Sequence, residues 1–324
     1  MSRFHQEVAS GQRFEFGRNW QRFLKRLNGQ RIRIAARSLQ RRLGVSSLAG
    51  TSFLDAGCGS GLFSLAARQL GAFVTSFDYD PHSVACTMAL RHRFFPNDPG
   101  WEVHQGSVLD REFLKSLGRY DVVYSWGVLH HTGAMWEAMD SVTLPVKPSG
   151  RLFIAIYNDQ GWQSRAWRHL KRAYCRLPRG LKLPFLLAVN APIQSAIFLR
   201  SLLLLQPHRY VLKRLLYRNN RGMSWWHDLV DWMGGYPFEV ATPEAVIRFY
   251  RERGYIVDNF WTVRNRQGCN EFVFRNLSHV LLGNVAERTV VREADEPGQE
   301  AVAPLRGVQT HHSLTAQGDR RGAA

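Results

Sequence analysis

The fold of this chain is decided by the stretch Phe53-Leu-Asp-Ala-Gly57-Cys-Gly59-Ser-Gly61-Leu62. It reads as a short apolar strand that ends in an acidic residue and then breaks into a loop with glycine at every second position. We expect the loop to lead into a helix over Leu62–Leu70. A strand and a helix joined with so little side-chain bulk are typical of loops that hold a nucleotide-like ligand.

The spacing of the glycines separates two kinds of ligand. A dinucleotide-binding loop has the pattern G-x-G-x-x-G, whereas the third glycine here, Gly61, comes one residue early. Asp55 stands two positions before the first glycine, where its carboxylate would repel a pyrophosphate. The same carboxylate suits S-adenosylmethionine, which carries an ammonium and a sulfonium but no phosphate. The loop therefore favours S-adenosylmethionine, and we expect Asp55, Gly57, Gly59 and Gly61 to bind it.

Strands and helices alternate along the segment that follows the glycine loop. Further strands are expected at Ala72–Phe77, Trp101–Gln105, Tyr120–Ser125 and Pro148–Ile156, and helices at Pro81–Phe94, Arg111–Leu117 and Ala134–Leu144. This alternation predicts an α/β fold with a parallel, doubly wound sheet.

Residues at the ends of the later strands complete the predicted cofactor site. Asp78 ends the second strand about twenty residues after the first glycine, where an acidic side chain can accept both ribose hydroxyls. Ser107 follows the third strand and is expected to bond the edge of the adenine, while Val108 and Tyr79 enclose its faces. Ser125, at the end of the fourth strand, is the last member of the set.

Taken together, these motifs resemble those of the class I S-adenosylmethionine-dependent methyltransferases. The resemblance rests on D-x-G-x-G-x-G at Asp55–Gly61, the strand-end acid Asp78, G-S-V at Gly106–Val108 and V-L-H-H at Val128–His131. It covers roughly residues 50–160, resumes near residues 242–276, and is strongest for the small-molecule branch that includes quinone-biosynthesis O-methyltransferases. The resemblance implies a seven-stranded, Rossmann-like sheet in the order 3-2-1-4-5-7-6 and an enzyme that uses S-adenosylmethionine.

The resemblance also indicates where catalysis takes place. Methyl transfer from a sulfonium is an in-line displacement, and an alcohol or phenol acceptor must also lose a proton. Histidine is the natural base near neutral pH, and His130 and His131 follow the fourth strand. Because His131 aligns with the histidine of V-L-E-H in the quinone O-methyltransferases, we predict it as the general base. His130 is included as a candidate, although for this residue we favour a structural role in shaping the loop.

Aromatic residues are expected to surround the acceptor. The first of them, Trp20, belongs to an N-terminal aromatic cluster that could close over the cofactor. The other candidates for acceptor binding are Trp126, Tyr157 and Tyr236, the last of which lies in a stiff, glycine-paired loop.

Cysteine usage and charge constrain the environment and the partners. Cys58, Cys86, Cys175 and Cys269 form no C-x-x-C pair and no metal-binding spacing, so we expect no metal and a reducing, cytoplasmic location. The start of the chain, Met1–Arg13, lacks the apolar core of a signal peptide. The net charge of +17 favours an anionic partner, which could be nucleic acid, membrane headgroups or an acidic substrate.

Much of this charge lies in an insertion after the fifth strand. Gly161–His227 contains no Asp or Glu. Its middle, Leu183–Leu205, is apolar, although Pro184, Pro192 and Arg200 interrupt it and disfavour a clean transmembrane span. The insertion therefore predicts a helical lid, for which two interpretations stay open. It could bind peripherally to an anionic membrane, or it could cover the acceptor site with its basic side chains in solvent.

Five segments are predicted along the chain. They are an N-terminal helical cap over residues 1–49, the cofactor-binding core over 50–160, the helical insertion over 161–241, a C-terminal part of the core over 242–283 and a disordered tail over 284–324. The cap is expected to contain a helix at Gln21–Leu43. The C-terminal part is expected to contain a helix from Thr242 and closing strands at Tyr255–Val263 and Asn270–Arg275.

The favoured function is O-methylation of a small or lipid-linked acceptor. The alternatives are methylation of a nitrogen or carbon acceptor, methylation of RNA held by the basic lid, and binding of S-adenosylmethionine without catalysis. Base methylation is disfavoured because exocyclic amino methylation typically uses an Asn/Asp-Pro-Pro-aromatic tetrad after the fourth strand. That site reads Ser125-Trp-Gly-Val128 here, and it also lacks the cysteine that cytosine-5 methylation requires.

Overall fold

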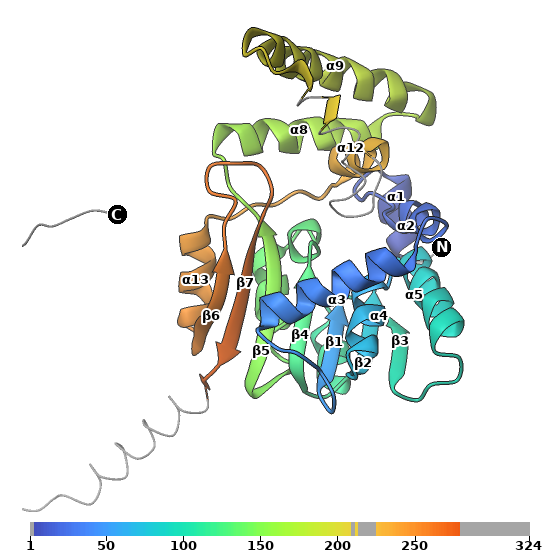
Figure 1. Cartoon of the computed structure of the whole chain (residues 1–324), viewed down its shortest axis with the longest axis vertical. Coiled ribbons are helices and arrows are strands. Elements are labelled where there is room, and N and C mark those ends of the chain that lie inside the picture. The colour runs from blue at the N-terminus through green and yellow to red at the C-terminus, as the bar shows by residue number, and fades with distance from the viewer. Residues whose placement is uncertain (1–2, 209–210, 213–224, 279–324) are drawn as a thin grey trace, which may run out of the picture. The chain divides into compact units, whose positions relative to one another are not determined.

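The computed structural model describes residues 3–208, 211–212 and 225–278 (Figure 1). Within these residues, seven strands form one sheet in the order β3-β2-β1-β4-β5-β7-β6, as predicted. Strands β1 to β5 run parallel, and β7 runs antiparallel to both β5 and β6. The strands are β1 Ser52–Ala56, β2 Phe73–Asp78, β3 Trp101–Gln105, β4 Tyr120–Trp126, β5 Val146–Tyr157, β6 Tyr255–Trp261 and β7 Cys269–Asn276.

Helices cover both faces of the sheet, which confirms the doubly wound α/β class. One face carries α3 Gly29–Leu43, α4 Leu62–Gln69 and α5 Pro81–Phe94, and the other carries α6 Arg111–Ser116, α7 Met135–Ser141 and α13 Pro243–Arg251. Helix α13 begins as expected, because the Thr242 hydroxyl accepts a hydrogen bond from the Ala245 amide at 3.3 Å.

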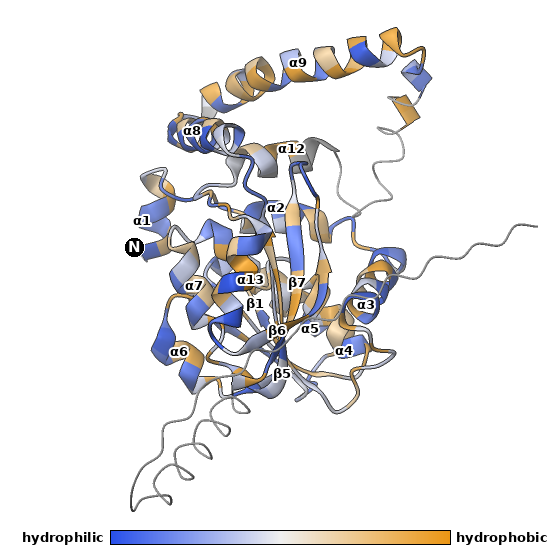
Figure 2. Cartoon of the chain, turned by 90° about the vertical axis from the view of Figure 1, so that its left-hand side faces the viewer, coloured by the Kyte–Doolittle hydropathy of each residue, from blue (hydrophilic) through white to orange (hydrophobic). Residues whose placement is uncertain are grey.

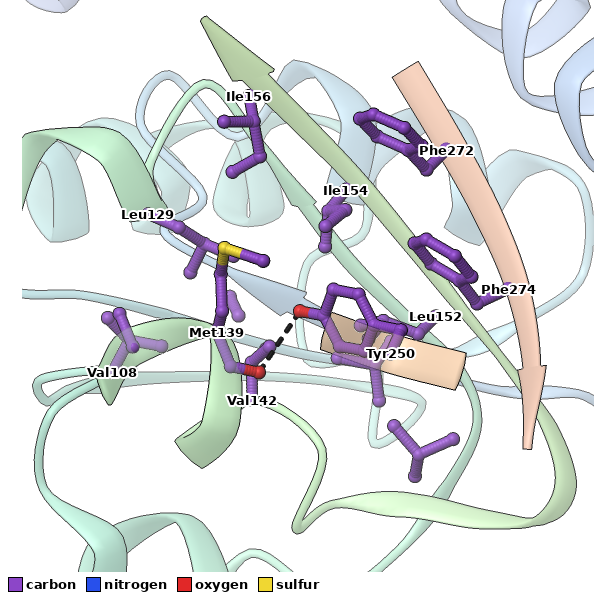
Figure 3. Close-up of a cluster of buried hydrophobic side chains, with 14 of the residues drawn as sticks. Val108, Leu129, Met139, Val142, Leu152, Ile154, Ile156, Tyr250, Phe272 and Phe274 are labelled. Carbon is purple, nitrogen blue, oxygen red and sulfur yellow. Dashed lines mark hydrogen bonds between the residues drawn. The ribbon is translucent and has the colours of Figure 1, made fainter. Parts of the chain in front are cut away.

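An apolar layer fills the space between the sheet and each set of helices. Figure 3 shows the layer beneath α7 and α13, where Ile154 of β5 lies beside Phe272 and Phe274 of β7. Tyr250 of α13 is fully buried there, and its hydroxyl donates to the Met139 carbonyl at 3.0 Å. Central strands that are buried on both faces need apolar side chains at successive positions, which is why their sequences read as continuous apolar runs.

The N-terminal segment differs from its prediction. The single helix expected over Gln21–Leu43 is two helices, α2 Gly17–Leu24 and α3, and a shorter helix, α1 Arg3–Ala9, precedes them. The chain turns at Asn28, whose side chain accepts a hydrogen bond from the Arg31 amide and caps α3. The prediction was wrong because the apolar spacing continues across the break, whereas the capping asparagine favours a new helix start.

The described part of the insertion consists of α8 Trp162–Arg176, α9 Arg179–Leu203 and α12 Trp225–Gly234, beyond the end of β5 (Figure 1). Helix α9 runs through Pro184 and Pro192 without interruption. Figure 2 shows many apolar residues along α9. Phe185, Leu186 and Val189 in its first half pack with residues of α8, whereas apolar side chains of its second half are exposed. These exposed residues are Ile193, Ile197, Phe198, Leu199, Leu202 and Leu203. By length and composition alone, α9 could cross a membrane.

All described elements belong to one compact unit, Met1–Leu281. The boundaries predicted at residues 50, 161 and 242 fall inside that unit and stay predictions. The predicted disordered tail, residues 284–324, lies outside the described residues.

Candidate active site

The glycine loop, Gly57–Gly61, connects β1 to α4 in a conformation that suits glycine. Gly57, Gly59 and Gly61 have φ angles of +87°, +54° and +76°, a region that other residues rarely adopt. A Cβ atom on Gly57 would lie 2.4 Å from the Val128 side chain, and one on Gly61 would lie 2.8 Å from the Thr87 backbone. The glycines therefore let the loop approach the end of β4 and let α4 approach α5.

Asp78 anchors the glycine loop from the end of β2. One carboxylate oxygen accepts from the Gly59 amide at 2.9 Å, and the other accepts from the Asp80 amide at 2.9 Å. Asp78 keeps slight solvent exposure, yet burial raises its pKa to about 6 against the lowering effect of the two amides. Each oxygen has a further lone pair, so the carboxylate can still accept hydroxyl groups from a ligand.

Asp55 lies beneath the glycine loop and is only 2% exposed. Its carboxylate accepts from the Ser64 hydroxyl at 2.5 Å, Ser64 accepts from Ser76 at 2.9 Å, and Ser76 accepts from Trp101 Nε1 at 3.0 Å. Burial, together with the nearby Asp78, raises the Asp55 pKa to about 7 against the lowering effect of the Ser64 hydrogen bond. Asp55 therefore joins the loop to the sheet and acts on a ligand mainly through its charge.

The other predicted cofactor residues differ in their exposure. The Ser107 hydroxyl accepts from the Leu109 amide, and Val108 is buried in the apolar layer. Ser125 is fully buried, and its hydroxyl donates to the Ala56 carbonyl, so it connects β4 to β1 inside the sheet. Tyr79 is half-buried. Its ring packs edge-on against Phe4 and lies beneath the Arg13 guanidinium at 5.0 Å.

These contacts fit S-adenosylmethionine better than a pyrophosphate ligand. Asp55, Asp78 and Asp80 gather around one loop, and burial raises the pKa of each. Carboxylates held close together favour a cation and repel a phosphate. Asp78 would hold the ribose hydroxyls and the glycine loop would hold the amino-acid end, while the bound cofactor would supply an activated methyl group.

The histidine turn, η1 Leu129–His131, follows β4. His131 Nδ1 lies 2.6 Å from the Pro237 carbonyl oxygen. Because a carbonyl can only accept, Nδ1 must carry the proton, and Nε2 keeps its lone pair. Burial lowers the His131 pKa to about 3, opposed by the Pro237 hydrogen bond and reinforced by Lys171 and Arg13. His131 is therefore neutral and can accept a proton only weakly.

His130 is completely buried. Neither of its ring nitrogens has a hydrogen-bond partner by distance and angle among the described residues, although the Ala155 backbone is near enough to favour the protonated form slightly. Its pKa is lowered well below the usual value, first by burial and then by His131 and Lys171. Its ring lies 4.0 Å from the ring of Tyr157, measured between centroids. The role of His130 in shaping the loop stays a prediction.

A cluster of rings extends from the histidine turn to α8. Tyr157, the last residue of β5, lies 5.4 Å from Trp232 and 5.3 Å from Phe238 between ring centroids. The ammonium of Lys171 lies 3.9 Å from the centroid of Trp232 and 4.7 Å from that of Phe238. We call His130, His131, Tyr157, Lys171, Trp232 and Phe238 the acceptor cluster.

Other aromatic residues predicted to bind the acceptor lie elsewhere. Trp20 lies on the glycine loop, with its Nε1 3.1 Å from the position of a Cβ on Gly59, and thus belongs to the cofactor side. Trp126 ends β4 and packs partly into the apolar layer beneath α3 and α4. Tyr236 packs with α8 and α9, and its carbonyl accepts from the Phe14 amide at 2.9 Å. Only Tyr157 joins the acceptor cluster itself.

Sequence reasoning missed Lys171 and Arg13. Arg13 donates to the carbonyls of His131 and Thr132 at 3.0 and 3.4 Å and forms an ion pair with Glu7 at 2.7 Å. No local pattern marks either residue, because each reaches the site from a separate helix or loop. Within the described residues, no group of three or more His, Cys, Asp or Glu side chains could hold a metal ion.

A family of methyltransferase domains matches residues 25–187, which is half of the chain. That span includes the glycine loop, Asp78 and the histidine turn. This chain is a class I S-adenosylmethionine-dependent methyltransferase. The resemblance seen in the motifs is thereby confirmed, and so is its cofactor.

Curated relatives of this methyltransferase carry the name ubiquinone biosynthesis O-methyltransferase. The protein from Azotobacter vinelandii is 32% identical over 112 residues, 34% of this chain and 46% of that protein. The protein from Pseudomonas paraeruginosa is 30% identical over 114 residues, 35% of this chain and 47% of that protein. The match thus spans just under half the length of these relatives.

Among solved structures, magnesium protoporphyrin IX methyltransferase from Synechocystis PCC 6803 is similar, with a TM-score of 0.46 and 13% identity over 80% of this chain and 93% of that chain. The N-methyltransferase NodS from Bradyrhizobium japonicum has a TM-score of 0.41 and 15% identity, covering 77% of this chain and 98% of that chain.

Proposed function

We propose that this methyltransferase methylates an oxygen of a small or lipid-linked acceptor, which reacts beside the histidine turn. The observation that carries the proposal is the hydrogen bond from His131 Nδ1 to the Pro237 carbonyl, because it leaves the Nε2 lone pair available to an acceptor hydroxyl. Curated relatives near 30% identity that are named O-methyltransferases support the same acceptor atom.

In this proposal, each cofactor residue contacts a different part of S-adenosylmethionine. Asp78 accepts the ribose hydroxyls, and Ser107 bonds the adenine edge. The glycine loop gives backbone access to the amino-acid end, and Asp55 favours the cationic ligand through its charge. The new carbon–oxygen bond forms as the carbon–sulfur bond breaks, and the electron pair of that bond stays on sulfur.

The weak basicity of His131 restricts the acceptor. A histidine with a pKa of about 3 takes a proton poorly from an alcohol, so the acceptor hydroxyl must itself be acidic, as in a phenol. The neutral imidazole then orients the hydroxyl and receives its proton as the methyl group moves. An enol or phenol therefore suits this site better than an aliphatic alcohol.

Substitution of His131 tests the proposal. We expect His131→Ala to lower kcat by on the order of a hundredfold while the affinity for S-adenosylmethionine stays unchanged. His92→Gln, on the exposed side of α5, is the matched control and should leave both quantities unchanged. The measurement is methyl transfer from labelled cofactor to catechol, with calorimetry for affinity. Turnover that barely changes in His131→Ala would reject the role of His131.

A membrane-associated acceptor is a second element of the proposal. Helix α9 presents an apolar second half to the outside, and the described residues 161–208 contain Arg and Lys but neither Asp nor Glu. An apolar helix with basic flanks suits the interface of an anionic bilayer. We propose a cytoplasmic enzyme that binds this surface peripherally and takes a lipid-linked acceptor from it.

Vesicle binding separates this idea from RNA binding and from a solvated lid. We expect co-sedimentation with vesicles that contain phosphatidylglycerol, weaker binding to phosphatidylcholine alone, and a loss on double substitution of Leu199 and Leu203 by Ser. Met88→Ser removes an exposed apolar side chain of α5 and should change nothing. A shift of RNA without vesicle binding would favour the RNA alternative, and binding to neither would favour the solvated lid.

A further inference from the structure

The two sides of the active site differ in the ionisable groups that they contain. Around the glycine loop, the ionisable neighbours are the carboxylates of Asp55, Asp78 and Asp80. Around the histidine turn, the charges that act on the two imidazoles are the cations Lys171 and Arg13. A carboxylate close to the turn, Glu239, accepts a hydrogen bond from the Met135 amide at the start of α7. Arg13 is paired with Glu7, so the charge of the acceptor side depends mainly on whether Lys171 is protonated.

Lys171 is the more unusual of the two cations. It is 0% exposed, on a helix whose other basic residues mostly face solvent. Its ammonium donates one hydrogen bond, to the Trp232 carbonyl, and faces the rings of Trp232 and Phe238. An ammonium has three N–H donors, and among the described residues no carboxylate pairs with this one. Burial lowers the Lys171 pKa to about 7, so the amine is partly protonated near neutral pH, and an anionic ligand would favour its protonated form.

His130 adds a second unsatisfied group to the same cluster. It is fully buried, its ring nitrogens lack hydrogen-bond partners among the described residues, and it feels the charge of Lys171. Buried polar atoms are nearly always hydrogen-bonded, so such an imidazole indicates a ligand position. Tyr157 and Trp232, which link His130 to Lys171, each keep part of their surface exposed. A planar ring can therefore contact them from the side of solvent.

From this geometry we propose that Lys171 and His130 form a subsite for an anionic group, and that the acceptor is an aromatic acid. Its carboxylate would receive N–H bonds from Lys171 and His130, its ring would stack on Tyr157 and Trp232, and its hydroxyl would face His131. This deepens the proposed function and rests on it. The carboxylate itself does not react, because the methyl group moves to the hydroxyl oxygen and the proton of that hydroxyl moves to His131.

Binding of two matched probes tests the subsite without turnover. 4-Hydroxybenzoate and its neutral isostere 4-hydroxybenzamide are titrated into the wild-type complex with S-adenosylhomocysteine and followed by ligand-observed NMR. A charge-assisted bond in a buried site predicts a preference of about tenfold or more for the benzoate. Equal affinity for the two probes, or binding of neither to a complex that still holds S-adenosylhomocysteine, would overturn the proposal.

Variants assign the preference to Lys171. Lys171→Met keeps the length of the side chain and removes its charge, so it should abolish the preference while the affinity for S-adenosylhomocysteine stays unchanged. Lys182→Met is the matched control, because that lysine also lies over a ring, Tyr174 at 5.5 Å, but outside the acceptor cluster. Retention of the preference in Lys171→Met, or its equal loss in Lys182→Met, would refute the assignment.

A conservative variant covers the case in which Lys171→Met does not fold. Lys171→Arg keeps the charge, so this variant should still bind 4-hydroxybenzoate more tightly than 4-hydroxybenzamide. Tighter binding of the benzamide by Lys171→Arg would also count against the subsite. Because the probe assay uses a complex that cannot react, its result is independent of the role of His131. Loss of turnover in His131→Ala with no anion preference would leave the proposed function standing and remove only this inference.

Discussion

The glycine loop and the acceptor cluster lie at neighbouring strand ends but are built in different ways. The glycine loop takes its form from residues close in sequence, with Asp78 bound to the amide of Gly59. The acceptor cluster joins the histidine turn to Lys171 of α8 and to Phe238 after α12, more than a hundred residues along the chain from one end to the other. The glycine loop and its neighbours form the cofactor half of the site, and the acceptor cluster forms the half proposed to bind the acceptor.

Two contacts hold these halves together. The Val128 side chain fills the space where a side chain on Gly57 would lie. Arg13 spans the site from the other side, since its guanidinium lies over Tyr79 and donates to the carbonyl of His131. A substitution at either contact should therefore affect both halves of the site. A substitution inside one half should not affect the other half.

The largest expected effect lies in the cofactor half. Asp78→Ala removes the acceptor of two backbone amides and of the proposed ribose hydroxyls, each worth about 1.5–3 kcal/mol with a charged acceptor. We expect the Kd for S-adenosylmethionine, measured by calorimetry, to rise by on the order of a hundredfold or more. Asp98→Ala, which removes a carboxylate paired with Arg68 outside the site, should leave the Kd unchanged. Full affinity in Asp78→Ala would contradict the assignment of this half.

The next effect concerns the contact between the halves. Gly57→Ala and Gly118→Ala both force a residue into positive φ, at +87° and +81°, with a strain of roughly 1–2 kcal/mol. Only Gly57→Ala adds a collision, with Val128, whereas nothing lies within 4 Å of a Cβ on Gly118. We expect denaturant unfolding to show a loss of about 3 kcal/mol for Gly57→Ala and about half as much for Gly118→Ala. Equal losses of stability in the two variants would mean that the glycine loop and the Val128 side chain are not in close contact at Gly57.

A smaller effect is a dependence on pH that we expect for the glycine loop but not for the acceptor cluster. Burial raises the pKa of Asp55 to about 7 and that of Asp78 to about 6, so the folded protein keeps protons that the unfolded chain has released. The stability of the free protein should consequently fall as pH rises from about 4 to about 7. The cationic cofactor favours the ionised carboxylates, so its affinity should rise about tenfold between pH 5.5 and pH 8.

The control for this pH effect is S-adenosylhomocysteine, which lacks the sulfonium charge and should show a smaller rise. His131 has a pKa of about 3 and stays neutral over the whole range, so it cannot produce the change. Affinity that is flat with pH for both ligands would show that the carboxylates of the loop are already ionised in the free protein.

The smallest expected effect lies in the insertion. Leu203 of α9 is 77% exposed, so Leu203→Ser should change the free energy of unfolding by no more than about 0.5 kcal/mol. Leu186→Ser, at a residue of the same helix that is 1% exposed, should cost several times more and shows that the assay responds. A large loss of stability in Leu203→Ser would mean that the second half of α9 packs against protein, and it would argue against membrane binding.

The strands and the conformation of the glycine loop were predictable because each rests on a local pattern, whereas the order of the strands was implied by the family resemblance. Strand β2 ends at Asp78 as expected, and the glycines stand at positive φ. One local detail was wrong. The helix expected over Gln21–Leu43 is broken before α3, which Asn28 caps. The apolar pattern continues across this break, so the spacing of apolar residues did not reveal it.

The acceptor side shows where sequence patterns stop being informative. His130 and His131 are adjacent and alike in sequence, yet only His131 meets a carbonyl, that of Pro237, and only His130 is left without a partner in the described structure. Trp20 was expected near the acceptor, but it lies on the glycine loop. The tautomer of one histidine and the isolation of the other depend on a loop that returns after a long insertion.

By itself, the sequence determined the fold class and favoured S-adenosylmethionine as the cofactor, while the order of the sheet was implied by the resemblance to a known family. It could do so because glycine spacing, strand-end acids and apolar periodicity act through neighbouring residues and need no knowledge of the rest of the chain. The tertiary structure alone decided that Lys171 is buried against Trp232 and Phe238, close enough to act electrostatically on both imidazoles. The burial and the charge of a site depend on side chains from distant segments of the chain. The sequence spacing of these residues does not show that they lie together in the folded protein.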